Sequence, residues 1–246
     1  MPQDSAASAP APLHVALVAI GSHGDVHPFV GMGVRLRERG HSCTVLTNGH
    51  FEPLVRRAGL GFAALAGEED YLNAIRNPDL WHPLKGFHAV AANILQLVRP
   101  TYDALAALRA EHGDRLVAVS SSLGFGARLA EEKLGLPHAT AHLSPSVFQT
   151  LHETPRYGGF PVRRTSPRWW KSLAYLLMNR IVDGTLAGPL NEVRRGLDLP
   201  PVRRNVFKHW MHAERLVLGM FPAWFAAVQP DWPSQTRTVG FPLYDE

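Results

Sequence analysis

A nearly continuous apolar run that ends in glycine, LHVALVAIG at residues 13–21, constrains the fold more than any other feature of the sequence. A strand with one solvated face alternates apolar and polar residues, and this run does not, so it suits a strand that is buried on both faces. Strands of that kind occur in parallel sheets covered by helices on both sides. The run therefore predicts an α/β protein.

Helical and strand patterns alternate along the rest of the chain. We expect a first helix that begins at Pro28 and stops at Gly40, because proline is favoured at the first helical position and glycine ends helices. Further helices are expected near 51–58, within 86–111 and at 123–134, and two more within 166–199, separated at Gly188 and Pro189. Strands are expected at 42–48, 60–65, 116–120, 138–144, 214–221 and 236–241. Such alternation predicts a Rossmann-like parallel sheet with helices on both faces.

The N-terminal sequence and the composition suggest a short extension followed by one domain. Residues 1–12, MPQDSAASAPAP, are interpreted as a disordered N-terminal extension, and residues 13–246 as a single domain. The single cysteine, Cys43, excludes an intramolecular disulfide and favours a reducing compartment, so we expect a cytoplasmic protein. The apolar runs fall short of the roughly 20 residues that span a bilayer.

Basic residues gather around a tryptophan pair, although the net charge is only +4. Arg163, Arg164, Arg168 and Lys171 surround Trp169 and Trp170, a combination that suits peripheral contact with an anionic membrane such as the inner membrane. No contact with nucleic acid is expected. The alternative is an ordinary amphipathic helix packed on the sheet with its arginines in water.

The loop after the first strand is the first place to look for a site, because open α/β sheets bind ligands outside the carboxyl ends of their strands. It contains one carboxylate, Asp25, and two imidazoles, His23 and His27, beside Gly21 and Gly24. The glycine spacing does not complete a G-x-G-x-x-G fingerprint, which disfavours a nicotinamide-dependent oxidoreductase. Asp25 is either an acid/base group or a cap that satisfies backbone N–H groups at the start of the helix.

No resident cofactor or metal is expected. His138 and His142 lie four residues apart, but on a predicted strand and without an accompanying carboxylate, so they do not suggest a metal site.

At GSHGDVHPFVGMGVRLRERGH the chain resembles the N-terminal domain of family 1 and family 28 glycosyltransferases of the GT-B fold, which carry a G-x-x-GD-V-x-P motif in this loop. The segments RPTYDAL, GARLAEEKLGLP, HLSPS, LNEVRRGLDL and VGFPLYD are similar to the bacterial rhamnosyltransferases of rhamnolipid synthesis. The resemblance implies that Asp25 is the general base, and that Ser22, His23, Gly24 and His27 belong to the catalytic loop or contact the acceptor. Plant members use a histidine there, oriented by an aspartate; this protein has Ser120, Ser121 and Ser122 instead, so that dyad is absent.

The resemblance also implies a function. An inverting enzyme of this type transfers a sugar, L-rhamnose from dTDP-rhamnose or glucose from UDP-glucose, to a hydroxyl of a hydrophobic acceptor such as a hydroxy fatty acid dimer. The nucleotide sugar is a co-substrate held mainly by a C-terminal domain that these 246 residues do not include, so the chain alone is expected to be inactive. The alternative from another class is a non-catalytic lipid-binding module that retains the fold.

The acceptor pocket is expected in the variable segments 67–100 and 145–175. Apolar residues recur there at helical spacing, which suits a greasy acceptor but also ordinary core packing. They are Phe87, Val90, Ile94 and Leu97 in the first segment, and Trp170, Leu173, Leu176 and Leu177 at the end of the second and just beyond it.

Overall fold

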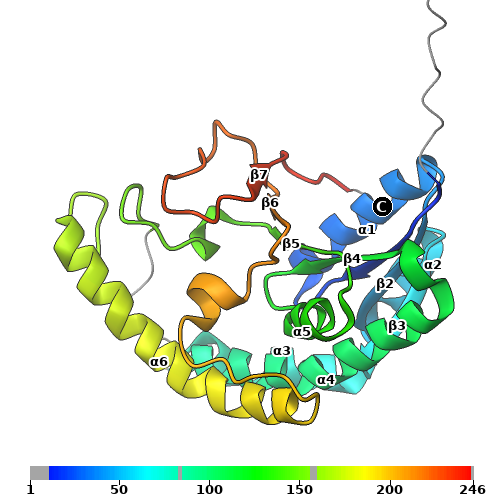
Figure 1. The fold of residues 1–246 in the computed structure, drawn as a ribbon, viewed down its shortest axis with the longest axis horizontal. Helices are drawn as coiled ribbons and strands as arrows, with labels where there is room; N and C mark the ends of the chain where they lie inside the picture. The colour runs from blue at the N-terminus through cyan, green and yellow to red at the C-terminus, as the bar shows by residue number, and fades with distance from the viewer. Residues whose placement is uncertain (1–10, 83–84, 156–159, 245–246) are drawn as a thin grey trace, which may run out of the picture.

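The computed structural model describes residues 11–82, 85–155 and 160–244. Within them one seven-stranded parallel sheet has the order β3-β2-β1-β4-β5-β6-β7 (Figure 1). The strands are β1 (His14–Val18), β2 (Ser42–Asn48), β3 (Gly61–Ala66), β4 (Leu116–Ser121), β5 (His138–His142), β6 (Leu216–Gly219) and β7 (Thr236–Thr238). The predicted Rossmann-like sheet is confirmed, whereas residues 1–10 of the predicted extension lie outside the described part.

Helices cover both faces of this sheet. They are α1 (His23–Glu38), α2 (Glu52–Arg57), α3 (Glu68–Arg76), α4 (Gly86–His112), α5 (Phe125–Leu134) and α6 (Arg168–Arg195). Short helical turns are η1 (Gly49–Phe51), η2 (Pro78–Trp81), η3 (Gly113–Arg115), η4 (Pro145–Val147) and the π-helical η5 (Val206–Trp210). Successive residues of β1 point to opposite faces: Val15 and Leu17 pack against α1 and α2, and Ala16 and Val18 against α4, α5 and α6.

The first helix begins five residues earlier than predicted, at His23 and not at Pro28. It starts at His23, after Ser22 as the N-cap, and Pro28 therefore lies inside it. The prediction was wrong because the carboxylate of Asp25 accepts a hydrogen bond from the backbone N–H of Ser22, which stabilises an earlier start. Pro28 has no N–H, so the carbonyl of Gly24 has no helical partner.

The predicted break at Gly188 and Pro189 is also wrong, because α6 is continuous through both residues. Leu186 and Leu190, on either side of the proline, are fully buried against the core and hold the helix together. Gly188 and Pro189 are themselves exposed, so water can solvate the carbonyl that the proline leaves unpaired. Likewise, segment 86–112 forms a single helix, and α3, which was not predicted, precedes it.

A buried ionic network anchors α6 to the rest of the domain. Glu132 of α5 accepts hydrogen bonds from Arg194 Nη2 at 2.7 Å and from the indole N–H of Trp210 at 2.6 Å. Arg128 bridges Glu131 and Glu214 nearby. The C-terminal half of α6 is thereby fixed against α5, while its N-terminal half extends past the sheet beside the segment that follows β5 (Figure 1).

Candidate functional site

The loop that follows β1 is hydrogen-bonded to the end of β4. These two strands are neighbours in the centre of the sheet, and the connections from them lead to helices on opposite faces. The backbone N–H of Ile20, in the loop after β1, donates to Oγ of Ser121, the last residue of β4, at 3.2 Å. This is the point at which a doubly wound sheet binds its ligand.

Asp25 lies in the first turn of α1, at this edge of the sheet. Its Oδ2 accepts hydrogen bonds from the backbone N–H of Ser22 at 2.8 Å and from Ser22 Oγ at 3.1 Å. Among the described residues, none hydrogen-bonds the other oxygen, Oδ1. The carboxylate is therefore a cap, as one interpretation predicted, yet it keeps one oxygen for another partner.

His23 and His27 lie beside it on α1, and Gly24 is exposed between them. His23 is also exposed, and its Nδ1 is 3.5 Å from the hydroxyl of Tyr71. Burial raises the pKa of Tyr71, and the negative charge of Asp25 raises it further. His27 is half-buried, with its ring edge toward Tyr244. The loop residues predicted from the sequence are therefore brought together, with Tyr71 as an addition from α3.

A second polar group was missed: a chain of hydrogen bonds from Ser122 to two buried histidines. Ser122 Oγ lies 2.7 Å from His142 Nδ1, and His142 Nε2 lies 2.9 Å from His212 Nδ1. Burial lowers the pKa of His142 well below its usual range and that of His212 to about 4, each helped by a neighbouring histidine, so both rings are neutral. The only signal in the sequence was a histidine at the end of β5.

A cavity of about 540 Å³ opens beside Ser122. Most of its lining is apolar and comes from α4, α6, η4 and η5 together with the turn after β4. The lining residues are Phe87, His88, Ser122, Leu123, Ser146, Val147, Gln149, Met178, Ile181, Val182, Phe207 and Met211. Of the predicted acceptor residues only Phe87 belongs to this cavity, because Ile94 is buried in the core and Val90 packs against it.

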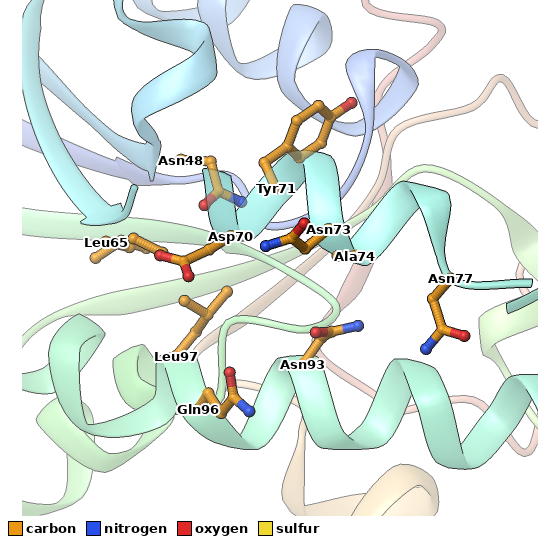
Figure 2. A pocket seen from close by; sticks show the side chains of 11 residues that line it. Asn48, Leu65, Asp70, Tyr71, Asn73, Ala74, Asn77, Asn93, Gln96 and Leu97 are labelled. Atoms are coloured by element: carbon orange, nitrogen blue, oxygen red, sulfur yellow. The ribbon is translucent and has the colours of Figure 1, made fainter. Parts of the chain in front are cut away.

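A pocket of about 430 Å³ with a different character lies over the ends of β2 and β3, between α3 and α4. Figure 2 shows that side-chain amides of the two helices face one another across it. We call it the amide pocket; its lining is Asn48, Leu65, Ala66, Asp70, Tyr71, Asn73, Ala74, Asn77, Asn93, Gln96 and Leu97. Tyr71 belongs both to this pocket and to the cluster around His23.

The N-terminal half of α6 presents an apolar stripe to solvent. Its members, at helical spacing, are Trp169, Leu173, Leu176, Leu177 and Ile181, with Trp169 69% and Ile181 63% exposed. Two other residues of the predicted membrane segment form hydrogen bonds within the protein. Trp170 donates its indole N–H to the carbonyl of Pro161, and Lys171 is buried with its ammonium donating to the carbonyls of Leu151 and His152.

The two histidines that were considered as metal ligands are both engaged in hydrogen bonds. His138 contacts Ser120 Oγ at 2.8 Å and Glu131 Oε2 at 2.9 Å, and His142 contacts Ser122 and His212. Within residues 11–82, 85–155 and 160–244, no helix is long and apolar enough to cross a bilayer.

Comparison with known proteins adds a family and several relatives. The model of the glycosyltransferase family 28 N-terminal domain matches residues 15–152. A sterol 3-beta-glucosyltransferase of Arabidopsis thaliana is 27% identical over 247 residues, which cover 93% of this chain and 37% of that protein. A sterol 3-beta-glucosyltransferase of Candida albicans is 24% identical over 241 residues, covering 95% of this chain and 15% of that protein.

Solved structures share the fold. A glycosyltransferase from Streptomyces nogalater superposes with a TM-score of 0.59 at 14% identity, covering 95% of this chain and 53% of that one. The calicheamicin glycosyltransferase superposes with a TM-score of 0.58 at 19% identity, covering 93% of this chain and 51% of that one. The chain thus spans about half the length of these structures and a smaller share of the curated relatives.

Proposed function

Because the chain belongs to the glycosyltransferase family 28 N-terminal domain family, we propose that it is the acceptor-binding half of an inverting GT-B glycosyltransferase with Asp25 as the general base. One observation carries the proposal: Asp25 uses Oδ2 to cap α1 and leaves Oδ1 without a partner among the described residues. A carboxylate held rigidly by one oxygen can accept a proton on the other.

The proposed reaction is a single displacement. The acceptor hydroxyl attacks the anomeric carbon of the nucleotide sugar, and Asp25 Oδ1 takes the hydroxyl proton as the new C–O bond forms. The old bond to the diphosphate breaks, the nucleoside diphosphate leaves with the electron pair, and the configuration inverts. General-base assistance of this kind is worth about 10²–10⁴-fold in rate.

The apolar cavity is the proposed site for the body of the acceptor. It lies beside Ser122, and the neighbouring Ser121 accepts a hydrogen bond from Ile20 in the loop that leads to Asp25. We therefore expect a hydroxyl at the end of an apolar body to reach the carboxylate. The names of the sterol 3-beta-glucosyltransferase relatives support a hydrophobic acceptor and favour glucose over L-rhamnose as the sugar.

Ser122 is the proposed positioning group in that cavity. In the proposed tautomers His142 Nε2 donates to His212 Nδ1 across 2.9 Å, and His142 Nδ1, which lies 2.7 Å from Ser122 Oγ, accepts from the hydroxyl of Ser122. The oxygen of Ser122 then accepts a hydrogen bond from the substrate hydroxyl.

The donor is expected to bind mainly to the half of the fold outside these 246 residues, because the chain spans about half of the solved relatives. Isothermal titration of the chain alone with UDP-glucose or a dTDP-sugar should give dissociation constants no tighter than millimolar. Micromolar binding would contradict the expectation that the donor binds mainly outside these residues.

The test of the base is Asp25→Asn in a protein that carries both halves. Asparagine can still accept the hydrogen bond from Ser22 but cannot take a proton, so we expect turnover to fall at least about 10²-fold with donor affinity and melting temperature nearly unchanged. The matched control is Asp103→Asn, which removes an exposed carboxylate paired with Arg99 on α4 and should leave turnover unchanged. Near-normal turnover of Asp25→Asn would leave the carboxylate as a cap alone.

The same experiment separates the enzyme from a non-catalytic lipid-binding module. A module of that kind would bind an apolar ligand in the cavity, but the two-half protein would transfer no sugar at any donor concentration. Detection of a glycosylated product by mass spectrometry excludes it.

We also propose that the α6 stripe contacts an anionic membrane and delivers an apolar acceptor to the cavity. Ile181 belongs both to the stripe and to the cavity lining, so the two apolar surfaces are continuous. Arg163, Arg168 and Arg180 are exposed near the stripe, and each basic residue at an anionic surface contributes about 1 kcal/mol. Arg164 contributes less, because it pairs with Glu153.

Liposome flotation tests this contact. The chain should float with vesicles that contain anionic lipid, float less at high salt, and lose flotation on the double substitution Trp169→Ala and Leu177→Ser. The control is Trp224→Ala, which removes an 80% exposed tryptophan on a different segment and should not change flotation. Equal recovery of native chain and double variant with the vesicles would rule the stripe out as the contact.

A further inference from the structure

The amide pocket contains hydrogen-bonding groups that the domain itself does not use. Asn48 Oδ1 is buried and has no partner among the described residues. Asn73 and Gln96 are exposed at the rim, and neither side chain hydrogen-bonds to another described residue. Asn93 donates one N–H to the carbonyl of Ala89, which leaves its own carbonyl oxygen available. Four amides therefore converge on one space with unused capacity (Figure 2).

The lining indicates the class of ligand. An amide offers a C=O acceptor and an N–H donor side by side, which matches neighbouring hydroxyl groups that both donate and accept. The lining contains no lysine or arginine, so it does not suit an anionic group. Leu65 and Leu97 add apolar surface on which the C–H face of a ring or chain can lie.

We propose that the amide pocket binds the vicinal hydroxyls of a sugar or polyol head group. Asn48, Asn73, Asn93 and Gln96 supply the hydrogen bonds, and the buried oxygen of Asn48 gains the partner that it lacks. A buried acceptor without a partner is costly, so a hydroxyl at this position is favoured.

Helix α4 borders both spaces, because His88 lines the apolar cavity and Asn93 lines the amide pocket. Five residues of an α-helix turn by about 140°, so these two side chains leave α4 on different sides. The head-group site is therefore proposed as a site of its own, and it does not depend on the proposed acceptor site.

Binding of small amphiphiles to the chain tests the proposal without any turnover. The probes are hexyl β-D-glucopyranoside, 1-O-hexylglycerol and 1-hexanol, titrated below micelle-forming concentrations and followed by ligand-detected NMR. We expect at least one of the two hydroxylated probes to bind about tenfold tighter than 1-hexanol. Tighter binding of hexyl β-D-glucopyranoside would indicate a sugar ring as the head group, and tighter binding of 1-O-hexylglycerol an open-chain diol. The double substitution Asn73→Ala and Gln96→Ala should abolish that advantage while leaving 1-hexanol binding unchanged.

The variant is expected to fold, because both residues are exposed on helices and alanine is the better helix former. Gln229→Ala, which removes an amide from a different segment far along the chain, is the matched control and should keep the advantage. The proposal is overturned if neither hydroxylated probe binds tighter than 1-hexanol, or if the advantage survives the double substitution. Failure of the Asp25 experiment would leave this binding result unaffected.

Discussion

Gly21 leaves the space that the carboxylate of Asp25 occupies. A Cβ at position 21 would collide with Asp25 Oδ2, and the backbone of Gly21 has a φ of +142°, which L side chains rarely adopt. The same oxygen caps α1 through Ser22. Gly21 is therefore needed for the position of the Asp25 carboxylate, which both caps α1 and carries the proposed base.

Gly21→Ala should lower the free energy of unfolding by more than Gly40→Ala. Both positions have a positive φ, and backbone strain of this kind costs about 1–3 kcal/mol, but nothing lies within 4 Å of a Cβ at Gly40. The additional loss at Gly21 measures the collision with Asp25. Urea denaturation of both variants, and of Gly21→Ala combined with Asp25→Ala, checks this expectation. Equal losses for the two single variants would show that the carboxylate simply moves aside.

Ser122→Ala should raise the KM for the acceptor about fivefold in the two-half protein, with little change in kcat. The substitution removes one hydrogen bond to a bound hydroxyl, worth about 1 kcal/mol, and leaves the base in place. Ser122→Thr keeps the hydroxyl and should restore most of the affinity. Steady-state kinetics with varied acceptor distinguish this positioning role from a structural one, which would lower kcat and the melting temperature together.

The buried histidines should make the domain acid-sensitive. The pKa of His212 is lowered by burial from its ordinary 6.5 to about 4, so the unfolded chain takes up the proton first. The stabilising contribution of neutral His212 is thus complete above pH 6.5 and is lost at roughly 1.4 kcal/mol per pH unit as pH falls toward 4. Urea denaturation at pH 7 and pH 5 should show this loss, and His212→Gln should make it smaller. An unchanged pH dependence in that variant would assign the acid sensitivity to other groups.

Glu132→Ala should destabilise the domain by about 3–5 kcal/mol. The substitution leaves the buried guanidinium of Arg194 without its carboxylate, and removing one member of a buried ion pair carries a cost of this size. Glu38→Ala breaks the exposed pair with Arg35 and should cost less than about 1 kcal/mol. Thermal and urea unfolding of the two variants test the contrast. Similar small losses would mean that water solvates Arg194 in the variant.

Local patterns determined the strands and the loop with the proposed base. The apolar run at 13–20 predicted β1, because a strand buried on both faces is apolar along most of its length. The β-branched residues within 42–48 predicted β2. The sequence also placed Asp25, His23 and His27 together, since they lie within five consecutive residues. Helix ends were harder: Pro28, Pro100 and Pro189 all lie inside helices, because capping by Asp25 and buried neighbours such as Leu186 and Leu190 outweigh the loss of single hydrogen bonds.

The sequence by itself determined the fold class and the turn that carries Asp25, because both depend on residues that are close along the chain. Only the tertiary structure brought His142 to Ser122 and His212, arranged four amides around one pocket, and buried Lys171 while it exposed Leu177. These features depend on which side of each helix faces the sheet and on which strands are neighbours. That choice follows from packing between segments that are far apart in the chain, such as those of His142 and His212, which are 70 residues apart, and no local pattern encodes it.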